Sequence, residues 1–256
     1  MIEVPADDRG FLLGDGLFET ILADRGRLDA FDAHAARLIR GCAVLGLPAP
    51  AAGDLFAAAE AVLAERGLAG ERAAVRLTWT AGSGGRGLDR PAAVTPRLIA
   101  QASPATAPGG PARLVTAAVR RNATSPAARL KTLAYLDNVV ARQAALAAGA
   151  DEALMLNTDG QVASGAAANL FWIVGDRLFT PAPDCGVLDG IMRARVLAAA
   201  TGLGIEAVEA RVGVEALAGA DAAFLTNSLI GLRDVSMIDE RVLGAGPMVE
   251  RLRQTL

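Results

Sequence analysis

The stretch Leu130-Lys131-Thr132-Leu133-Ala134-Tyr135-Leu136-Asp137-Asn138 contains the only lysine of this 256-residue chain. Lys131 follows an apolar residue, lies shortly after a turn signal at 122–126, and precedes a helical pattern. Apolar surroundings lower the pKa of a primary amine, and the neutral amine can form a Schiff base, which arginine cannot. The stretch therefore makes Lys131 a candidate for covalent chemistry. The alternative is a surface lysine without a chemical role.

Composition restricts the class of protein. The chain has 28 acidic and 25 basic side chains, a net charge of -3, and no basic cluster, which argues against a nucleic-acid partner. No apolar run is long enough to span a bilayer, and the N-terminal sequence MIEVPADDRG lacks the features of a secretion signal. Cys42 and Cys185 are far apart and lack metal-ligand spacing. We expect a soluble cytoplasmic protein without a metal or disulfide framework.

A segment rich in proline and glycine divides the chain. Residues 102–111 read Ala-Ser-Pro-Ala-Thr-Ala-Pro-Gly-Gly-Pro, which is typical of a linker. We expect an N-terminal domain at 1–103, a linker at 104–111 and a C-terminal domain at 112–256, each of ordinary domain size. Strand and helix patterns mix irregularly, which predicts two α+β domains.

Hydrophobic periodicity and turn residues locate the individual elements. In the first domain we expect strands at 18–22, 73–80 and 98–101, a hairpin turn at Arg25-Gly26, and helices at 32–45, capped by Asp32, and at 54–66. In the second we expect a strand at 113–119, a helix at 136–148, and a meander of strands at 153–156, from 161, at 169–174 and at 178–180. A helix at 190–201 with Gly202 as its cap, a strand at 205–212, a short helix at 214–218 and a strand at 223–226 follow.

Four further features suit the binding of anions. In the loop Gly82-Ser83-Gly84-Gly85-Arg86-Gly87, the backbone can approach a ligand while Arg86 offers two donors to a carboxylate; a flexible hairpin is the alternative. Leu188-Asp189-Gly190-Ile191 opens a helix, and Thr226-Asn227-Ser228 ends a strand, so both can meet a phosphate or simply cap their elements. Arg37 has apolar neighbours, and a buried guanidinium needs an anion, whereas we interpret His34 as structural.

These features, in this order, resemble the class IV aminotransferase family, the fold-type IV enzymes that use pyridoxal phosphate. The resemblance covers nearly the whole chain. Its motifs are Asp8-Arg9-Gly10-Phe11, Gly14-Asp15-Gly16-Leu17-Phe18-Glu19-Thr20, His34-Ala35-Ala36-Arg37-Leu38, the Lys131 stretch, Asp151 to Asn157, Ala167-Ala168-Asn169-Leu170-Phe171, Gly190-Ile191-Met192-Arg193 and Thr226-Asn227-Ser228. The resemblance implies the D-amino acid aminotransferase-like α+β fold, with a small N-terminal α/β domain and a larger barrel-like C-terminal domain.

The resemblance also implies roles for single residues. Lys131 is expected to hold pyridoxal 5'-phosphate covalently and later to transfer a proton. The phosphate is expected to lie against Arg37, the helix start at Gly190 and Ile191, and Asn227 and Ser228, with Leu188 against the pyridine ring and Ser164 beside its nitrogen. Phe18 and Arg86 are expected to line the pocket of a small amino substrate that carries a carboxylate. Family members are usually homodimers.

Ser164 is the main departure from the family pattern. Most relatives have a glutamate there, which keeps the pyridine nitrogen protonated, and a serine holds that proton poorly. Ala134 and Asp234 also replace common residues, an asparagine and a proline, without an evident reason. The glycine loop, Asn169-Leu170-Phe171-Trp172 and Gly190-Ile191-Met192-Arg193 resemble the aminodeoxychorismate lyases of the family. We therefore expect a lyase of folate synthesis; a D-amino or branched-chain amino acid transaminase, or a relative with weak or lost turnover, is the alternative.

Overall fold

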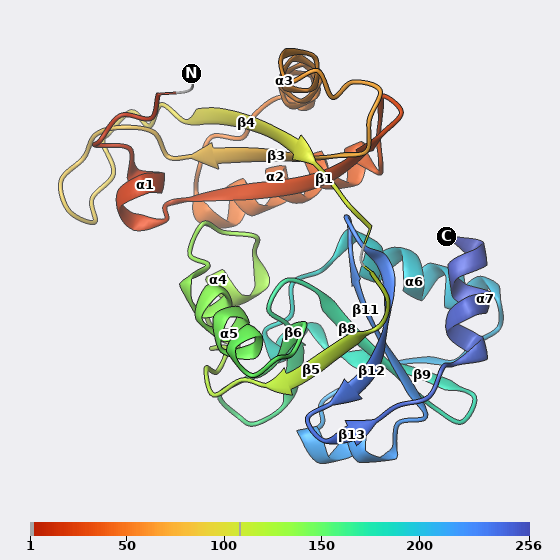
Figure 1. The fold of residues 1–256 in the computed structure, drawn as a ribbon. Helices are drawn as coiled ribbons and strands as arrows, with labels where there is room; N and C mark the ends of the chain where they lie inside the picture. Colours follow the sequence, from red (N-terminus) through yellow and green to blue (C-terminus); the bar gives the residue numbers. More distant parts are fainter. Residues whose placement is uncertain (1–2, 108) are drawn as a thin grey trace. The chain divides into compact units, whose positions relative to one another are not determined.

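The computed structural model describes residues 3–107 and 109–256, and it divides the chain into two compact units. The first unit contains the residues up to Ala107 together with Leu130–Ala134, and the second contains the rest (Figure 1). The division after Ala107 falls inside the range 104–111 that we expected to be a linker. The five residues around Lys131 lie in the first unit, although we assigned them to the C-terminal domain.

In the first unit, four described strands form an antiparallel sheet in the order β2-β1-β3-β4. They are β1 (Gly16–Asp24), β2 (Arg27–Leu28), β3 (Ala73–Thr80) and β4 (Arg97–Pro104). The predicted hairpin turn is confirmed, because Arg25 and Gly26 both have positive φ, as a two-residue turn requires. Pro104, which we expected to be the first residue of the linker, pairs with Ala73 of β3 as the last residue of β4.

Helices α2 (Phe31–Leu45) and α3 (Ala52–Glu65) bury their apolar faces against this sheet. Their core contains Leu17 and Ile21 from β1, Leu38 and Leu55 from the helices, and Val75 from β3. Side chains alternate between the two faces of a strand, so residues on the other face of the sheet point away from the helices. Our prediction that Asp32 caps α2 was wrong, because Ala30 is the cap residue and Asp32 lies in the first turn. The short helix α1 (Arg9–Leu13) was not predicted.

The second unit is built around a nine-stranded sheet, in the order β10-β9-β8-β11-β12-β5-β6-β7 with β13 paired to β12. The strands are β5 (Ala112–Thr116), β6 (Glu152–Leu156), β7 (Val162–Gly165), β8 (Asn169–Val174), β9 (Arg177–Pro181), β10 (Ala207–Ala210), β11 (Ala222–Asn227), β12 (Gly231–Ile238) and β13 (Arg241–Val242). The predicted meander was wrong at one step: β6 pairs with β7 and β8 with β9, but β8 pairs with β11 instead of β7. Strand alternation cannot reveal such a pairing between strands distant in sequence.

The sheet of the second unit is curled, so that strands from both ends of the order share one interior. Leu114, Leu154, Val162, Leu170 and Leu225 belong to a single buried cluster, although they come from β5, β6, β7, β8 and β11. A continuous cluster from such distant strands requires the two ends of the sheet to bend towards each other.

Helices cover the outer surface of this sheet. They are α5 (Leu136–Ala147), α6 (Ile191–Gly202) and α7 (Pro247–Thr255). The unit also contains the short helix α4 (Pro126–Arg129) and 3₁₀ turns at Pro183–Cys185 and Val214–Gly219. Gly202 is the last residue of α6 and not its cap, which is Leu203; Gly204 follows with φ +69°. Among the described residues, no helix is both long and apolar enough to cross a membrane.

Phe224 is an aromatic side chain whose loss should destabilise the second unit strongly. It is fully buried and stacks on Phe171, with 5.0 Å between the ring centroids. We expect Phe224→Ala to lower the free energy of unfolding by about 3 to 5 kcal/mol, because the truncation leaves a cavity under α6 and α7. Urea unfolding followed by Trp172 fluorescence, in a Trp79→Phe background, measures the second unit alone. The exposed Val242→Ala is the control and should change this value by less than about 0.5 kcal/mol.

Candidate active site

The Lys131 segment lies along the edge of β1 as an additional short strand. The Phe18 N–H donates to the carbonyl of Lys131 at 2.9 Å, and the Leu133 N–H donates to the carbonyl of Gly16 at 3.0 Å. Thr132 is opposite Leu17 in this antiparallel bridge. Because Leu17 points into the core, alternation places Lys131 and Phe18 together on the face that the helices leave open. A side chain at Gly16 could not fit, since its Cβ would lie 2.4 Å from the Trp79 carbonyl oxygen.

The amine of Lys131 lies against an aromatic ring and near a second cation. Its Nζ is 4.2 Å from the centroid of the Phe18 ring, and the Arg76 guanidinium carbon is 3.6 Å from the same centroid. Both contacts have cation–π geometry. Sequence reasoning missed Arg76, because an arginine on the polar face of a strand is not distinguishable from a solvated one.

Burial lowers the pKa of Lys131 from 10.5 to about 8. The Glu19 carboxylate opposes this shift, while the positive charges of Arg37 and Arg76 increase it. At pH 7 about a tenth of the side chain is therefore the neutral, nucleophilic amine, far more than for a lysine with the ordinary pKa. The structure thus gives Lys131 the electrostatic environment that the sequence led us to expect.

On the opposite, helix-covered face of the sheet, Glu19 binds Arg37 and His34 of α2. The Arg37 Nε and Nη2 donate to Glu19 Oε1 and Oε2 at 2.8 and 2.6 Å, and His34 Nδ1 is 2.7 Å from Oε2. Burial would raise the pKa of Glu19, but the hydrogen bonds from Arg37 and His34 outweigh it and hold that pKa below its usual value. From the sequence we predicted an anion beside Arg37 but did not identify which residue supplies it. The structure shows that it is Glu19, which the strand register places there.

In the second unit, the start of α6 offers backbone donors to an anion. Gly190 caps the helix without a side-chain hydrogen bond, and a Cβ at this position would lie 2.0 Å from Asn169 Oδ1. The Asn169 Nδ2 donates to the Leu188 carbonyl at 2.9 Å, which shapes the entry to the helix. Thr226 pairs with Asn169 across β8 and β11, and its hydroxyl is fully buried without a protein partner. A helix start beside an unpaired hydroxyl suits a phosphate.

Asn227 shapes the turn that follows β11. Its Oδ1 accepts hydrogen bonds from the N–H groups of Leu229 and Ile230, each at 2.9 Å, and its Nδ2 donates to the Ala167 carbonyl at 3.0 Å. Its side chain therefore makes the turn-capping contacts that we gave as the alternative to phosphate binding. Ser228 is half-buried in the same turn.

Ser164 is buried on β7, where it is paired with Met155 of β6. Its hydroxyl donates to the carbonyl of Gly165 at 2.8 Å. The buried carboxylate of this strand pair is Glu152, whose Oε1 accepts from the Ala166 N–H at 3.2 Å and whose Oε2 lies 3.2 Å from Arg142. Glu152 is therefore engaged by the backbone and by an arginine.

The structure distributes the predicted site residues over both units. Within the first unit it brings Lys131 and Phe18 into contact, with Arg37 held by Glu19 on the helix-covered side of the sheet. Arg86 belongs to the same unit and is exposed on the loop after β3. The remaining predicted residues lie in the second unit and are Ser164, Leu188, Gly190, Ile191, Asn227 and Ser228.

The single lysine makes the environment of Lys131 directly measurable. In protein labelled with ¹³C-lysine, we expect the Cε resonance to titrate with a pKa of about 8. Arg76→Met should raise this pKa because it removes a neighbouring positive charge, and Glu19→Gln should lower it because it removes the opposing negative charge. Glu206→Gln, which removes an exposed carboxylate of the second unit, is the control and should leave it unchanged. A wild-type midpoint near 10.5 would contradict the burial of the amine.

Comparison with known proteins identifies the family. The family model for amino-transferase class IV matches residues 16–238. Aminodeoxychorismate lyase of Bacillus subtilis (strain 168) is 31% identical over 91% of this chain and 80% of its own length. D-alanine aminotransferase of Bacillus licheniformis is 29% identical over 99% of this chain and 90% of its own length. The chain is therefore similar to enzymes with different reactions.

The fold of this chain is also similar to that of a solved structure from the family. The 4-amino-4-deoxychorismate lyase of Pseudomonas aeruginosa superimposes with a TM-score of 0.90 at 33% identity, over 100% of this chain and 95% of that one. The predicted two-domain α+β fold of the fold-type IV enzymes is thereby confirmed. Enzymes of this family are aminotransferases and lyases that depend on pyridoxal phosphate. This chain belongs to the class IV aminotransferase family.

Proposed function

We propose that this protein is an aminodeoxychorismate lyase, which converts 4-amino-4-deoxychorismate to 4-aminobenzoate and pyruvate in folate synthesis. The observation that carries the proposal is the buried Lys131 amine, whose pKa lies near 8 beside Phe18. The lyase assignment is supported by two similar lyases at 31% and 33% identity and by the glycine loop that contains Arg86.

The residues present fit pyridoxal 5'-phosphate. Lys131 is a primary amine whose environment lowers its pKa to about 8 and so increases the neutral fraction that covalent attachment of the cofactor requires. The start of α6 and the buried unpaired hydroxyl of Thr226 provide donors for a phosphate. We assign phosphate binding to Gly190, Ile191, Asn227, Ser228 and Arg37, contact with the pyridine ring to Leu188, and the place beside the ring nitrogen to Ser164.

The bound cofactor supplies an electron sink for the substrate carbon that carries the amino group. Lys131 takes the proton from that carbon, and its depressed pKa suits an amine that must accept and release protons near neutral pH. The substrate then loses the enol of pyruvate while its ring becomes aromatic. No oxidant or reductant is consumed. Aromatisation supplies driving force, so the weaker support that Ser164 gives to the ring nitrogen is sufficient for this reaction.

The substrate is recognised by the open face around Lys131 and by the glycine loop. Phe18 packs beside the amine and gives an apolar surface for the ring of the substrate. Arg86, which is exposed on its loop, binds a substrate carboxylate through its two parallel donors. The assembly as a homodimer in the cytoplasm stays a prediction that rests on the family resemblance.

A transaminase that acts on D-amino or branched-chain amino acids is the second candidate. It is favoured by the similarity to D-alanine aminotransferase at 29% identity. Against a D-amino acid enzyme, Leu88 stands where a histidine often joins the carboxylate site. Against a branched-chain enzyme, Asn227-Ser228-Leu229 replaces a Gly-Thr-Ala turn. A relative with weak or lost turnover, because of Ser164, is the third candidate.

The test is the release of pyruvate from 4-amino-4-deoxychorismate by protein reconstituted with pyridoxal phosphate. We expect pyruvate and 4-aminobenzoate in equal amounts, and a loss of at least about a thousandfold in kcat for Lys131→Ala, because the base and the point of attachment are both removed. Visible absorbance of the loaded protein shows independently whether the cofactor binds. Cofactor binding without pyruvate release would overturn the lyase assignment and direct the work to amino-donor screens with both enantiomers.

Ser164→Glu tests whether the serine limits the reaction. A carboxylate at this place stabilises the protonated pyridine and so strengthens the electron sink. Because aromatisation already drives the elimination, we expect lyase kcat to change by less than about threefold, and any side transamination with D- or L-alanine to increase by about tenfold. A large rise in lyase turnover would show that the serine is a defect. Ser236→Glu, on β12, is the control for the added charge.

A further inference from the structure

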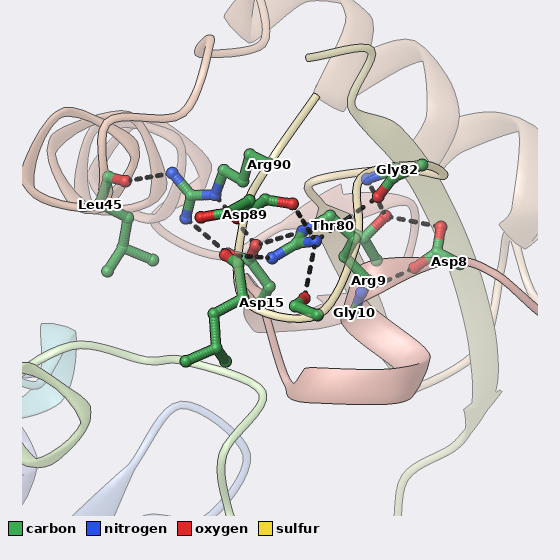
Figure 2. Close-up of polar contacts among 12 residues, drawn as sticks. Asp8, Arg9, Gly10, Asp15, Leu45, Thr80, Gly82, Asp89 and Arg90 are labelled. Carbon is green, nitrogen blue, oxygen red and sulfur yellow. Dashed lines mark hydrogen bonds and ion pairs between the residues drawn. The ribbon is translucent and has the colours of Figure 1, made fainter. Parts of the chain in front are cut away.

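The loop between β3 and β4 is wrapped around one buried arginine that the proposed mechanism does not use. Arg9 is only 4% exposed, although it carries a full charge. Its Nη2 donates to the Leu88 carbonyl at 3.0 Å, and its Nη1 donates to the carbonyls of Asp89 at 3.0 Å and Gly87 at 3.3 Å, with Gly84 at 3.5 Å. A buried guanidinium is thereby satisfied mainly by backbone carbonyls of a single loop (Figure 2).

The loop fits closely around this guanidinium because glycines let its backbone approach. A Cβ at Gly85 would lie 2.9 Å from Arg9 Nη1 and 2.2 Å from the Asp89 carbonyl oxygen. At Gly82, where φ is +74°, a Cβ would lie 1.9 Å from the Thr95 carbonyl oxygen. Glycine is thus required at these two positions by space as well as by backbone conformation. These close contacts restrict the backbone conformation of the loop, and the loop surrounds the Arg9 guanidinium.

Asp15 and Arg90 connect this arrangement to the framework of the first unit. Asp15 Oδ2 accepts from the Nε atoms of Arg9 and Arg90, each at 2.9 Å, and its Oδ1 accepts from Arg90 Nη2 at 2.5 Å. Arg90 Nη1 donates to the Leu45 carbonyl at the end of α2, at 2.7 Å. The hydrogen bonds from Arg90 and Arg9 hold the pKa of Asp15 below its usual value despite its burial. Figure 2 shows the carboxylate between the two guanidinium groups.

Hydrogen bonds also hold α1 against the start of the loop. The Arg9 N–H donates to the Gly82 carbonyl at 2.8 Å, and the Gly82 N–H donates to the Thr80 hydroxyl at 3.0 Å. Asp8 caps α1 and also accepts from the Thr80 hydroxyl at 2.9 Å. The backbone of Arg9 therefore holds the start of the loop while its side chain holds the rest.

We propose that Arg9 is a positioning residue for substrate binding: it fixes the loop from Gly82 to Asp89 and thereby sets where Arg86 presents its guanidinium to a substrate carboxylate. The proposal rests on the function proposed above, in which Arg86 binds that carboxylate. Arg86 lies between Gly85 and Gly87, so its backbone has little rigidity of its own. Four carbonyls on both sides of Arg86 are held by one side chain, which removes the entropic cost of ordering the loop when substrate binds.

The experiment compares the kinetics of pyruvate release by the holoenzyme in four forms: wild type, Arg9→Lys, Arg86→Gln and the double variant. Lysine keeps the charge of Arg9 but loses its planar fork, so the loop is released while the charge stays. We expect Arg9→Lys and Arg86→Gln each to raise KM about tenfold with kcat within about twofold, because only carboxylate binding is affected. If Arg9 acts through Arg86, the double variant has a KM no higher than the worse single variant.

Arg97→Lys is the matched control. Arg97 is also an arginine of the first unit that pairs with a buried aspartate, Asp8, but it does not contact the loop carbonyls bound by Arg9. The KM of the Arg97→Lys variant should stay within about twofold of the wild-type value. A KM for Arg9→Lys that equals that of Arg97→Lys, or KM effects of Arg9→Lys and Arg86→Gln that multiply in the double variant, would overturn the proposal.

A second pair of variants leaves Arg9 in place, in case Arg9→Lys does not fold. Gly85→Ala introduces a methyl group against Arg9 and Asp89, whereas Gly87→Ala adds one at another positive φ with no atom within 4 Å. Both carry backbone strain, but only Gly85→Ala displaces the loop from Arg9. We expect the larger KM increase, about tenfold, for Gly85→Ala. Equal KM values for the two variants would contradict the proposal.

Hydrogen exchange separates this proposal from the lyase assignment. If the wild type releases no pyruvate, the proposed function fails, and the amide exchange of residues 82–89 in the holoenzyme then decides on the role of Arg9. Faster exchange in Arg9→Lys, confined to this loop and absent in Arg97→Lys, supports its role in fixing the loop. Unchanged exchange of these amides overturns the proposal for any substrate.

Discussion

The pairing of the Lys131 segment with β1 is the constraint on which the arrangement of the first unit's open face depends. Two backbone hydrogen bonds, from the Phe18 N–H to the Lys131 carbonyl and from the Leu133 N–H to the Gly16 carbonyl, hold a five-residue segment in the first unit. The residues before and after this segment belong to the second unit. This register alone decides that the amine lies on the face opposite the helices. A shift by one residue would direct Lys131 into the hydrophobic core and Thr132 onto the open face.

Charges on both sides of this sheet set the reactivity of the amine. Glu19 lies on the helix side, where it forms an ion pair with Arg37 and lies 2.7 Å from His34 Nδ1. Arg76 lies over Phe18 on the open face and favours the neutral lysine. The lysine pKa is therefore a balance between burial, two guanidinium groups and one carboxylate. A strand of only nine residues, β1, carries both Phe18 and Glu19 and so links the two faces.

Local patterns predicted most elements but not the pairing of distant strands. Strand β3 and helix α2 were placed within a residue or two, because alternation and helical periodicity are properties of short segments. The step from β7 to β8 was wrong, because the partner of β8 is β11 and only the curled sheet brings them together. Helix α7 and strand β12 were missed, since their patterns are mixed and their burial depends on contacts distant in sequence.

By itself, the sequence determined the candidate lysine, the glycine loop and the family, because residue identity and motif order are local information. The tertiary structure alone decided which groups act on that lysine and on that loop. Glu19 and Arg76 reach the surroundings of Lys131 through the pairing of β1 with its neighbours, and Arg9 reaches a loop more than 70 positions away in the sequence. Such contacts depend on strand register and on the path of the backbone, and these are fixed only when the whole unit packs its core.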